Sequence, residues 1–134
     1  MPAAQVLDSH ALLKLLRDEP GAEAVAQILE KAGERDHPVH MTEVNYAEVQ
    51  CMIRRKDGDA AWQTIAGELV AAPIQFHPAD RALADTAADF KARFNISLAD
   101  AFAAALAKEK KAELITGDLE FKPLEKEIRI NWLK

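Results

Sequence analysis

The chain alternates short apolar runs with longer stretches of helical spacing. Five runs have the length and composition of β-strands: residues 5–7, 39–41, 74–77, 113–116 and 128–133. Between them, apolar residues recur every three or four positions, which predicts helices at residues 10–17, 22–34, 43–55, 60–71, 79–93 and 98–110. Because strands and helices alternate throughout, we expect an α/β fold of three layers. A central, mainly parallel sheet of about five short strands would carry helices on both faces.

Residues that typically start or stop helices lie near these boundaries. Ser9, Thr42 and Ser97 each precede a helical stretch and suit an N-cap, because a hydroxyl accepts a backbone N–H of the first turn. Pro78 suits the first turn of the fifth helix, and Asn95 suits a left-handed residue after its end.

The helix expected at residues 43–55 contains few apolar residues, so its inner face is less evident. Val44, Ala47 and Cys51 recur at helical spacing and form its predicted inner stripe, with Tyr46 as a further candidate. Cys51 is therefore expected in the core. As the only cysteine, it can form neither an internal disulfide nor an all-cysteine metal site.

The length of 134 residues suits a single domain spanning residues 1–134. No stretch approaches the ~18 apolar residues of a membrane span, and the N-terminus lacks the pattern of a signal peptide, so we expect a soluble, cytoplasmic protein. The formal net charge is −5, from 17 Lys and Arg against 22 Asp and Glu. By itself, an acidic balance disfavours a nucleic-acid partner, because phosphate backbones attract cations.

Four acidic residues lie at strand ends or in apolar helices. Asp8 directly follows the first strand, and Asp118 lies two residues after the fourth, at the ends where parallel sheets form ligand sites. Glu48 and Asp100 lie in helical stretches with apolar neighbours. An uncompensated carboxylate in apolar surroundings costs several kcal/mol. The four acids therefore indicate a site for Mg²⁺ or Mn²⁺, which prefer carboxylate oxygens.

Each acid also has a simpler explanation. Asp8 and Asp118 suit turns or helix N-termini, and Asp100 suits a capping box with Ser97. Glu48 suits a solvated helix face. The metal hypothesis therefore depends on all four acids together.

Four short blocks carry one of these acids each: residues 6–13, 44–49, 96–101 and 114–118. In their order and spacing, the blocks resemble the PIN domain family, and more narrowly the VapC-type toxins of bacterial toxin–antitoxin pairs. The resemblance covers essentially the whole chain. It implies a PIN fold and a ribonuclease that depends on Mg²⁺ or Mn²⁺.

The resemblance also implies roles for individual residues. The catalytic, metal-holding quartet of the family matches Asp8, Glu48, Asp100 and Asp118. Polar positions beside the acids match Ser9, Asn45 and Thr116, which would orient carboxylates or waters. The bound metal would lower the pKa of a water molecule that attacks the RNA phosphodiester.

As a VapC-type toxin, the protein would form a homodimer, cleave RNA and be neutralised by a cognate antitoxin protein. Two alternatives stay open: a PIN nuclease in RNA maturation, and a PIN-fold interaction module without activity. The acidic balance no longer argues against RNA once four negative charges are assigned to a metal site.

Other polar groups have less defined roles. Two basic clusters, residues 54–56 and the lysines of residues 108–111, end the helices that carry Glu48 and Asp100. Contacts with RNA phosphates and stabilisation of the helix C-termini both explain them. His10, close to Asp8 in the sequence, is either structural or a substrate contact.

Overall fold

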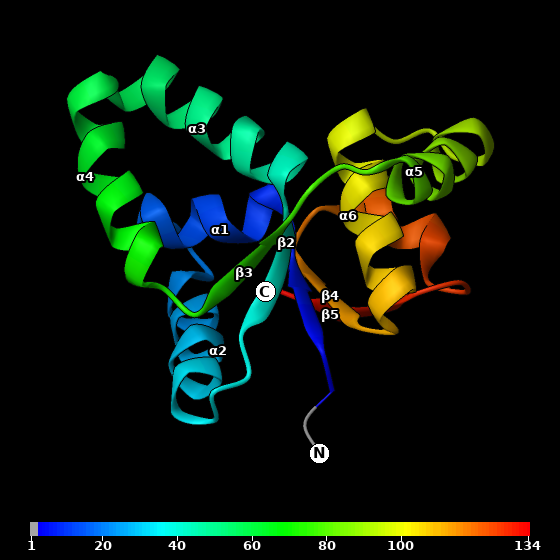
Figure 1. The fold of residues 1–134 in the computed structure, drawn as a ribbon, viewed down its shortest axis with the longest axis horizontal. Helices are drawn as coiled ribbons and strands as arrows, with labels where there is room; N and C mark the ends of the chain where they lie inside the picture. The colour runs from blue at the N-terminus through cyan, green and yellow to red at the C-terminus, as the bar shows by residue number, and fades with distance from the viewer. Residues whose placement is uncertain (1–2) are drawn as a thin grey trace.

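The computed structural model, which describes residues 3–134, is built around one five-stranded sheet (Figure 1). Its strands are β1 (Gln5–Leu7), β2 (Val39–Thr42), β3 (Ile74–His77), β4 (Glu113–Thr116) and β5 (Arg129–Trp132). All of them pair in parallel, in the spatial order β3-β2-β1-β4-β5. Each strand lies within one residue of its predicted run, and the predicted α/β fold is confirmed.

Helices connect the strands and cover both faces of the sheet. They are α1 (Ser9–Leu16), α2 (Ala22–Glu34), α3 (Glu43–Asp57), α4 (Asp59–Ala71), α5 (Arg81–Arg93), α6 (Leu98–Lys110) and the 3₁₀ helix η1 (Leu119–Leu124). Helices α1 to α4 lie on one face, and α5, α6 and η1 on the other (Figure 1). Within residues 3–134, no helix is both long and apolar enough to cross a membrane.

The sheet separates one hydrophobic cluster on the α5–α6 side from two on the side of α1 to α4. Val6 and Leu114 pack on the α5–α6 side, whereas Leu7 and Ile115 pack on the α1–α2 side, because successive side chains of a strand face opposite ways. Helix α6 packs against β1, β2 and β4, and its residues 101–107 are all buried. Their mostly small alanine side chains let α6 approach the sheet closely.

The strand order places the segments that follow β1 and β4 side by side at the carboxyl ends of the strands. From β1 the chain moves outward to β2 and β3, and it then returns to the other side of β1 for β4 and β5. The carboxyl ends of β1 and β4 therefore flank the point where the strand order reverses, which is where parallel sheets form ligand sites. Asp8 follows β1 and Asp118 follows β4.

Two helix starts differ from the prediction. The N-cap of α1 is Asp8, whose carboxylate accepts a first-turn N–H, and Ser9 is already helical. Asp80 is the N-cap of α5, so Pro78 lies before this helix and not in its first turn. Because aspartate caps helices as well as serine does, the local pattern could not choose between neighbouring candidates.

The end of α5 also differs from the prediction. Its C-cap is Phe94, in an extended conformation (φ −128°, ψ 152°), and Asn95 does not have a positive φ. Phe94 packs against the core formed by α5 and α6, so the chain extends there instead of turning back at Asn95.

The predicted inner face of α3 is wrong. The residues that α3 buries most deeply are Asn45, Val49 and Ile53. Cys51 and Ala47 are exposed, and Val44 is only partly buried against the α6 side. The further candidate, Tyr46, is partly buried against the core that α3 shares with α1 and α4. The hydrophobic pattern pointed to the wrong face because one of the buried positions is an amide.

The buried side chain of Asn45 joins the starts of three helices. Its Nδ2 donates to Ser9 Oγ (3.1 Å) at the start of α1 and to the Ala99 carbonyl (3.1 Å) in α6. Its Oδ1 accepts the hydroxyl of Thr42, the N-cap of α3. The Ser9 hydroxyl in turn donates to the Asn45 carbonyl (3.3 Å). The helix that Asp8 caps and the helices that carry Glu48 and Asp100 are therefore fastened to one another.

Asn45→Ala is expected to lower the free energy of unfolding by about 2–4 kcal/mol, because it leaves buried hydrogen-bonding groups without partners. Urea unfolding at pH 7 measures the change. Asn95→Ala, at an exposed position, is the matched control and should stay within about 0.5 kcal/mol of the wild type. Equal effects of the two substitutions would contradict the role assigned to Asn45.

Candidate functional site

The deepest residue of the site is Asp8, whose side chain is fully buried. One carboxylate oxygen accepts the Ala11 N–H at 2.7 Å, and the other accepts the Thr116 hydroxyl. The same Thr116 oxygen accepts the N–H of Asp118 at 3.0 Å. Thr116 therefore links the acid after β1 to the loop after β4.

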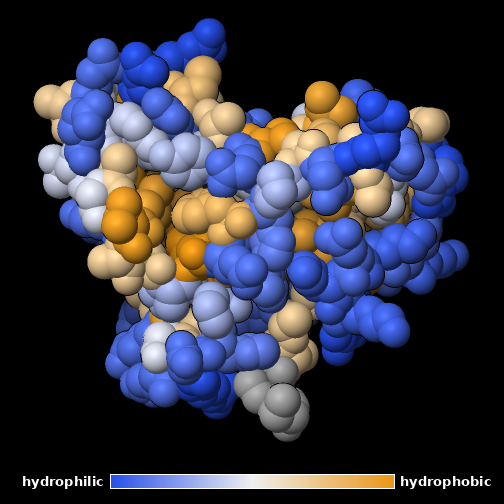
Figure 2. All heavy atoms as spheres, in the orientation of Figure 1, coloured by the Kyte–Doolittle hydropathy of each residue, from blue (hydrophilic) through white to orange (hydrophobic). Residues whose placement is uncertain are grey.

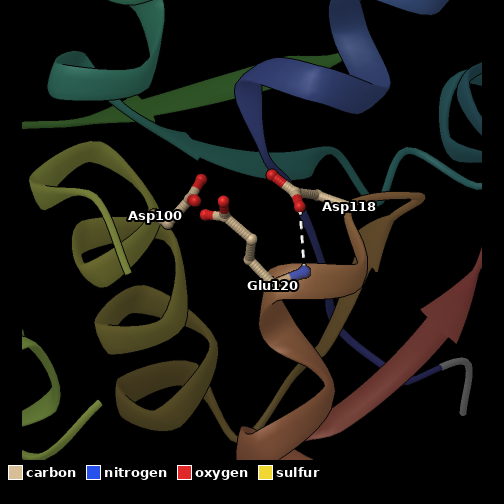
Figure 3. A group of neighbouring side chains, drawn as sticks. All are labelled: Asp100, Asp118 and Glu120. Atoms are coloured by element: carbon tan, nitrogen blue, oxygen red, sulfur yellow. Dashed lines mark hydrogen bonds between the residues drawn. The ribbon is translucent and has the colours of Figure 1, made fainter. Parts of the chain in front are cut away.

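Three further carboxylates meet beside it. Asp100, Asp118 and Glu120 each have an oxygen within 4.8 Å of the others (Figure 3). The N–H of Asp100 is held by Ser97 Oγ (3.1 Å), which confirms the predicted N-cap of α6. Asp118 caps η1 by accepting the Glu120 N–H (2.9 Å). This bond turns η1 so that the Glu120 side chain points toward Asp100 (Figure 3).

Glu48, on α3, lines the same cavity as these three acids. The volume of this cavity is about 300 Å³. The structure thus brings all four predicted acids to the carboxyl edge of the sheet and adds Glu120 to them. Glu120 was not predicted, because η1 has no helical apolar period. The only available signal was its position two residues after Asp118.

The electrostatics of the site are unfavourable to carboxylates. Burial raises the pKa of Asp8 to about 7. The hydrogen bonds from Thr116 and Ala11 lower this pKa in part, and the charges of Asp100 and Asp118 raise it further. Burial, then Asp118, raises the pKa of Asp100 to about 6, with smaller contributions from nearby glutamates.

No cation compensates these charges in the part of the chain that the structure describes, since none of its ion pairs includes a site acid. Asp100 is 9% exposed and the cavity is open, so an ion can reach the acids. Clustered carboxylate oxygens without a protein cation are a donor set that suits a hard divalent ion. The residues present therefore fit such a metal.

The three predicted assisting residues divide into two groups. Thr116 contacts Asp8 directly. Ser9 and Asn45 bond to each other and to backbone groups, and among the described residues neither bonds to an acid side chain. Their observed contacts hold helices together.

His10 forms one side of the cavity. Its ring lies so close to Gly117 that a Cβ at that glycine would be 3.0 Å from His10 Cε1, so a larger residue there would push the ring aside. Its Nδ1 is buried without a hydrogen-bond partner among residues 3–134. Burial, then the charge of Lys14, lowers the pKa of His10.

The two basic clusters lie at the C-terminal ends of α3 and α6, one or more helical turns beyond the acids that these helices carry. Lys110 ends α6, ten residues after Asp100, or about 15 Å along the helix axis. In the other cluster, Arg54 Nε pairs with Asp59 at 2.9 Å, whereas Arg55 and Lys56 have no ion pair within the described chain.

The sequence matches the family model of the PIN domain over residues 6–127. The chain belongs to the PIN domain family. A search among curated proteins finds no match.

Several solved structures share this PIN fold. VapBC2 from Rickettsia felis, bound to a DNA fragment from its promoter, aligns with TM-score 0.79 and 11% identity, covering 98% of this chain and 99% of the other. DNA-bound VapBC from Salmonella typhimurium aligns with TM-score 0.73 and 13% identity, covering 97% of this chain and 98% of the other. VapC20 of Mycobacterium tuberculosis is a toxin that cleaves the sarcin-ricin loop. It aligns with TM-score 0.72 and 15% identity, covering 90% of this chain and 94% of the other.

The buried charge of Asp8 is expected to lower the stability of the metal-free PIN chain. Its pKa is about 7 in the fold and 3.8 without the fold. The folded state therefore retains a proton that the unfolded state has lost, and the contribution of Asp8 to the free energy of unfolding falls as pH rises through this window. Asp8→Asn mimics the protonated carboxyl. It should match the wild type near pH 4 and be more stable by roughly 1–3 kcal/mol at pH 8.

Urea unfolding in EDTA at both pH values measures this difference. The histidines titrate in both proteins, so only the difference between variant and wild type is interpreted. The control is Asp85→Asn, at an exposed position on α5, which should show no pH-dependent difference. An Asp8→Asn difference that stays constant from pH 4 to pH 8 would refute the raised pKa.

Proposed function

We propose that this PIN-family chain is a metal-dependent endoribonuclease of the VapC type, which hydrolyses RNA phosphodiester bonds at the site formed by Asp8, Glu48, Asp100 and Asp118. Glu120 is added as a fifth acid of this site. The single observation that carries the proposal is the convergence of Glu48, Asp100, Asp118 and Glu120 in one cavity without a protein cation, with the buried Asp8 close enough to feel their charges. Such a group is unfavourable unless a divalent ion binds to it, and phosphodiester hydrolysis is the chemistry that ions held in this way commonly support.

Each protein group has a distinct part in the proposed site. Asp100, Asp118 and Glu120 would hold Mg²⁺ or Mn²⁺, with Asp8 and Glu48 beside them. Thr116 holds the Asp8 carboxylate in place through its hydroxyl. A bound ion supplies charge stabilisation at the phosphate and lowers the pKa of a bound water. The open cavity gives an RNA strand access to the acids.

The fold relationship supports the role of a toxin. Structures with the same fold include VapBC proteins of a toxin–antitoxin family and a toxin that cleaves the sarcin-ricin loop. We therefore propose that a cognate antitoxin protein neutralises this chain, that the chain forms a homodimer, and that it acts in the cytoplasm. The clustered carboxylates are a natural target for a cationic side chain of the antitoxin, which would compete with the metal.

The two alternatives make different predictions. A nuclease of RNA maturation would cleave RNA but would not arrest growth when expressed alone. A non-catalytic interaction module would neither bind Mn²⁺ nor cleave RNA. The five carboxylates favour an active enzyme, because a binding module would gain nothing from clustered, uncompensated charges.

The deciding experiment is incubation of purified, antitoxin-free protein with total RNA, with and without Mn²⁺, followed by mapping of the cleaved ends. Cleavage should require the metal and stop in EDTA. Asp100→Asn and Asp118→Asn should each lower the rate more than about 100-fold, since even outer partners of metal ligands cost about 10–100-fold when changed. Glu120→Gln should lower it about 10–100-fold.

Asp85→Asn and Glu43→Gln, at exposed positions on α5 and α3, are matched controls and should cleave RNA at the wild-type rate. Circular dichroism checks that each variant is folded. Full cleavage by folded Asp100→Asn in Mg²⁺ would refute the site, and the absence of both Mn²⁺ binding and cleavage by the wild type would favour the interaction module.

A further inference from the structure

The cavity that contains the acids has a second, chemically different end. Its walls include Leu13 of α1 and Met52 of α3 as well as the carboxylates. Met52 lies four residues after Glu48, about one helical turn or 5.4 Å along α3. The cavity lining therefore holds acidic and apolar side chains on neighbouring turns of α3, in the region where the surface is notched between the α3 side and the α6 side (Figure 2).

Met52 lacks the packing that a half-buried apolar side chain normally has. It is partly buried, but it belongs to none of the three hydrophobic clusters of the described chain. Leu13, across the cavity, is packed at its base into the cluster of α1, α3 and α4. Met52 thus presents an apolar, adaptable thioether to the cavity beside the acids.

His10 gives the same cavity a flat wall. One side of its ring lies close to Gly117, where a Cβ would be 3.0 Å from His10 Cε1. An imidazole plane and a methionine sulfur are both favourable neighbours of an aromatic ring. The apolar end therefore suits a flat aromatic group more than an aliphatic chain.

The charge pattern along α3 indicates which aromatic group this is. Glu48, Met52 and Lys56 follow one another at four-residue intervals, so acidic, apolar and basic side chains succeed each other on one side of the helix. Lys56 is exposed and has no ion pair among residues 3–134. A nucleic-acid strand presents a phosphate, a base and a further phosphate over a comparable path, whereas an apolar peptide side chain offers nothing to the acidic or basic positions.

We propose that the wall formed by Leu13, Met52 and His10 is a nucleobase subsite, which binds the base next to the scissile phosphate and so contributes to the choice of cleavage position. The inference rests on the proposed ribonuclease function and extends it to substrate selection. The base would be held by stacking and apolar contact, so the subsite would favour large, readily stacked bases over small ones.

The test compares Met52→Ala with the wild type on a short RNA that contains one cleavage position. A second set of substrates carries an abasic ribose on either side of the scissile phosphate in turn. On the intact RNA, Met52→Ala should lower kcat/KM about tenfold, since one apolar contact in a pocket discriminates by about 10–200-fold. On the substrate that lacks the bound base, variant and wild type should cleave equally.

Two further variants separate a subsite from a structural effect. Met52→Leu keeps an apolar side chain of similar volume and should retain most of the wild-type kcat/KM. Cys51→Ala alters the neighbouring exposed position of α3 and should cleave all substrates as the wild type does. Thermal unfolding confirms that Met52→Ala is folded.

Several outcomes would overturn the subsite. One is an unchanged kcat/KM for Met52→Ala on intact RNA, and another is an equal loss on intact and abasic substrates. Wild-type cleavage of RNA by Met52→Ala, combined with weakened inhibition by the antitoxin, would assign this wall to the protein partner. Failure of the wild type to cleave any RNA with Mn²⁺ would instead refute the proposed function.

Discussion

The burial of the Asp8 carboxylate is the constraint on which the rest of the structure depends. A buried charge requires hydrogen-bond partners, and Asp8 takes them from two segments, the first turn of α1 and Thr116 at the end of β4. The parallel pairing of β1 with β4 places these partners side by side. Sheet register, the start of α1 and the loop that carries Asp118 are therefore coupled through one side chain.

The second requirement is to hold like charges together. Burial is the main cause of the raised pKa values of Asp8 and Asp100, and repulsion among Asp8, Asp100 and Asp118 adds to it. Neutral groups oppose this repulsion: Asn45 fastens the helix starts, and Thr116 holds the β4 loop. Because neutral groups hold the fold together here, the carboxylate oxygens of Asp100, Asp118 and Glu120 can face one another without a bound protein cation. A scaffold that used cations for the same purpose would have neutralised the site.

The helix α6 shows how packing serves the site. Its run of buried residues, mostly alanines, lets the helix lie against three strands, and Ser97 fixes its first turn. Asp100 is thereby carried to the sheet edge on a rigid element. On the opposite side, α3 contributes Glu48 from a helix that is exposed along much of its length. The cavity thus lies between a deeply buried helix and a more accessible one, which suits the binding of an extended substrate.

The sequence alone determined the order of the strands and α-helices, because hydrophobic periodicity depends only on local geometry, but it did not reveal the 3₁₀ helix η1. It also indicated four acids, since carboxylates at strand ends and in apolar helices are unusual wherever they occur. Local patterns failed where long-range contacts decided the outcome. The inner face of α3 is set by the amide of Asn45 and not by Cys51, and Asp8 replaces Ser9 as a helix cap.

Only the tertiary structure decided which acids meet. Asp8 and Thr116 are 108 positions apart in the chain, and no local signal reports their contact. Glu120 joins the acids because Asp118 caps the short helix η1 and turns it back toward α6. Only the tertiary structure shows that Met52 lines the same cavity as Asp100, Asp118 and Glu120, which are far from it in the sequence. A site depends on distances across the fold, and these are fixed by strand order and packing, which act between residues far apart in the chain.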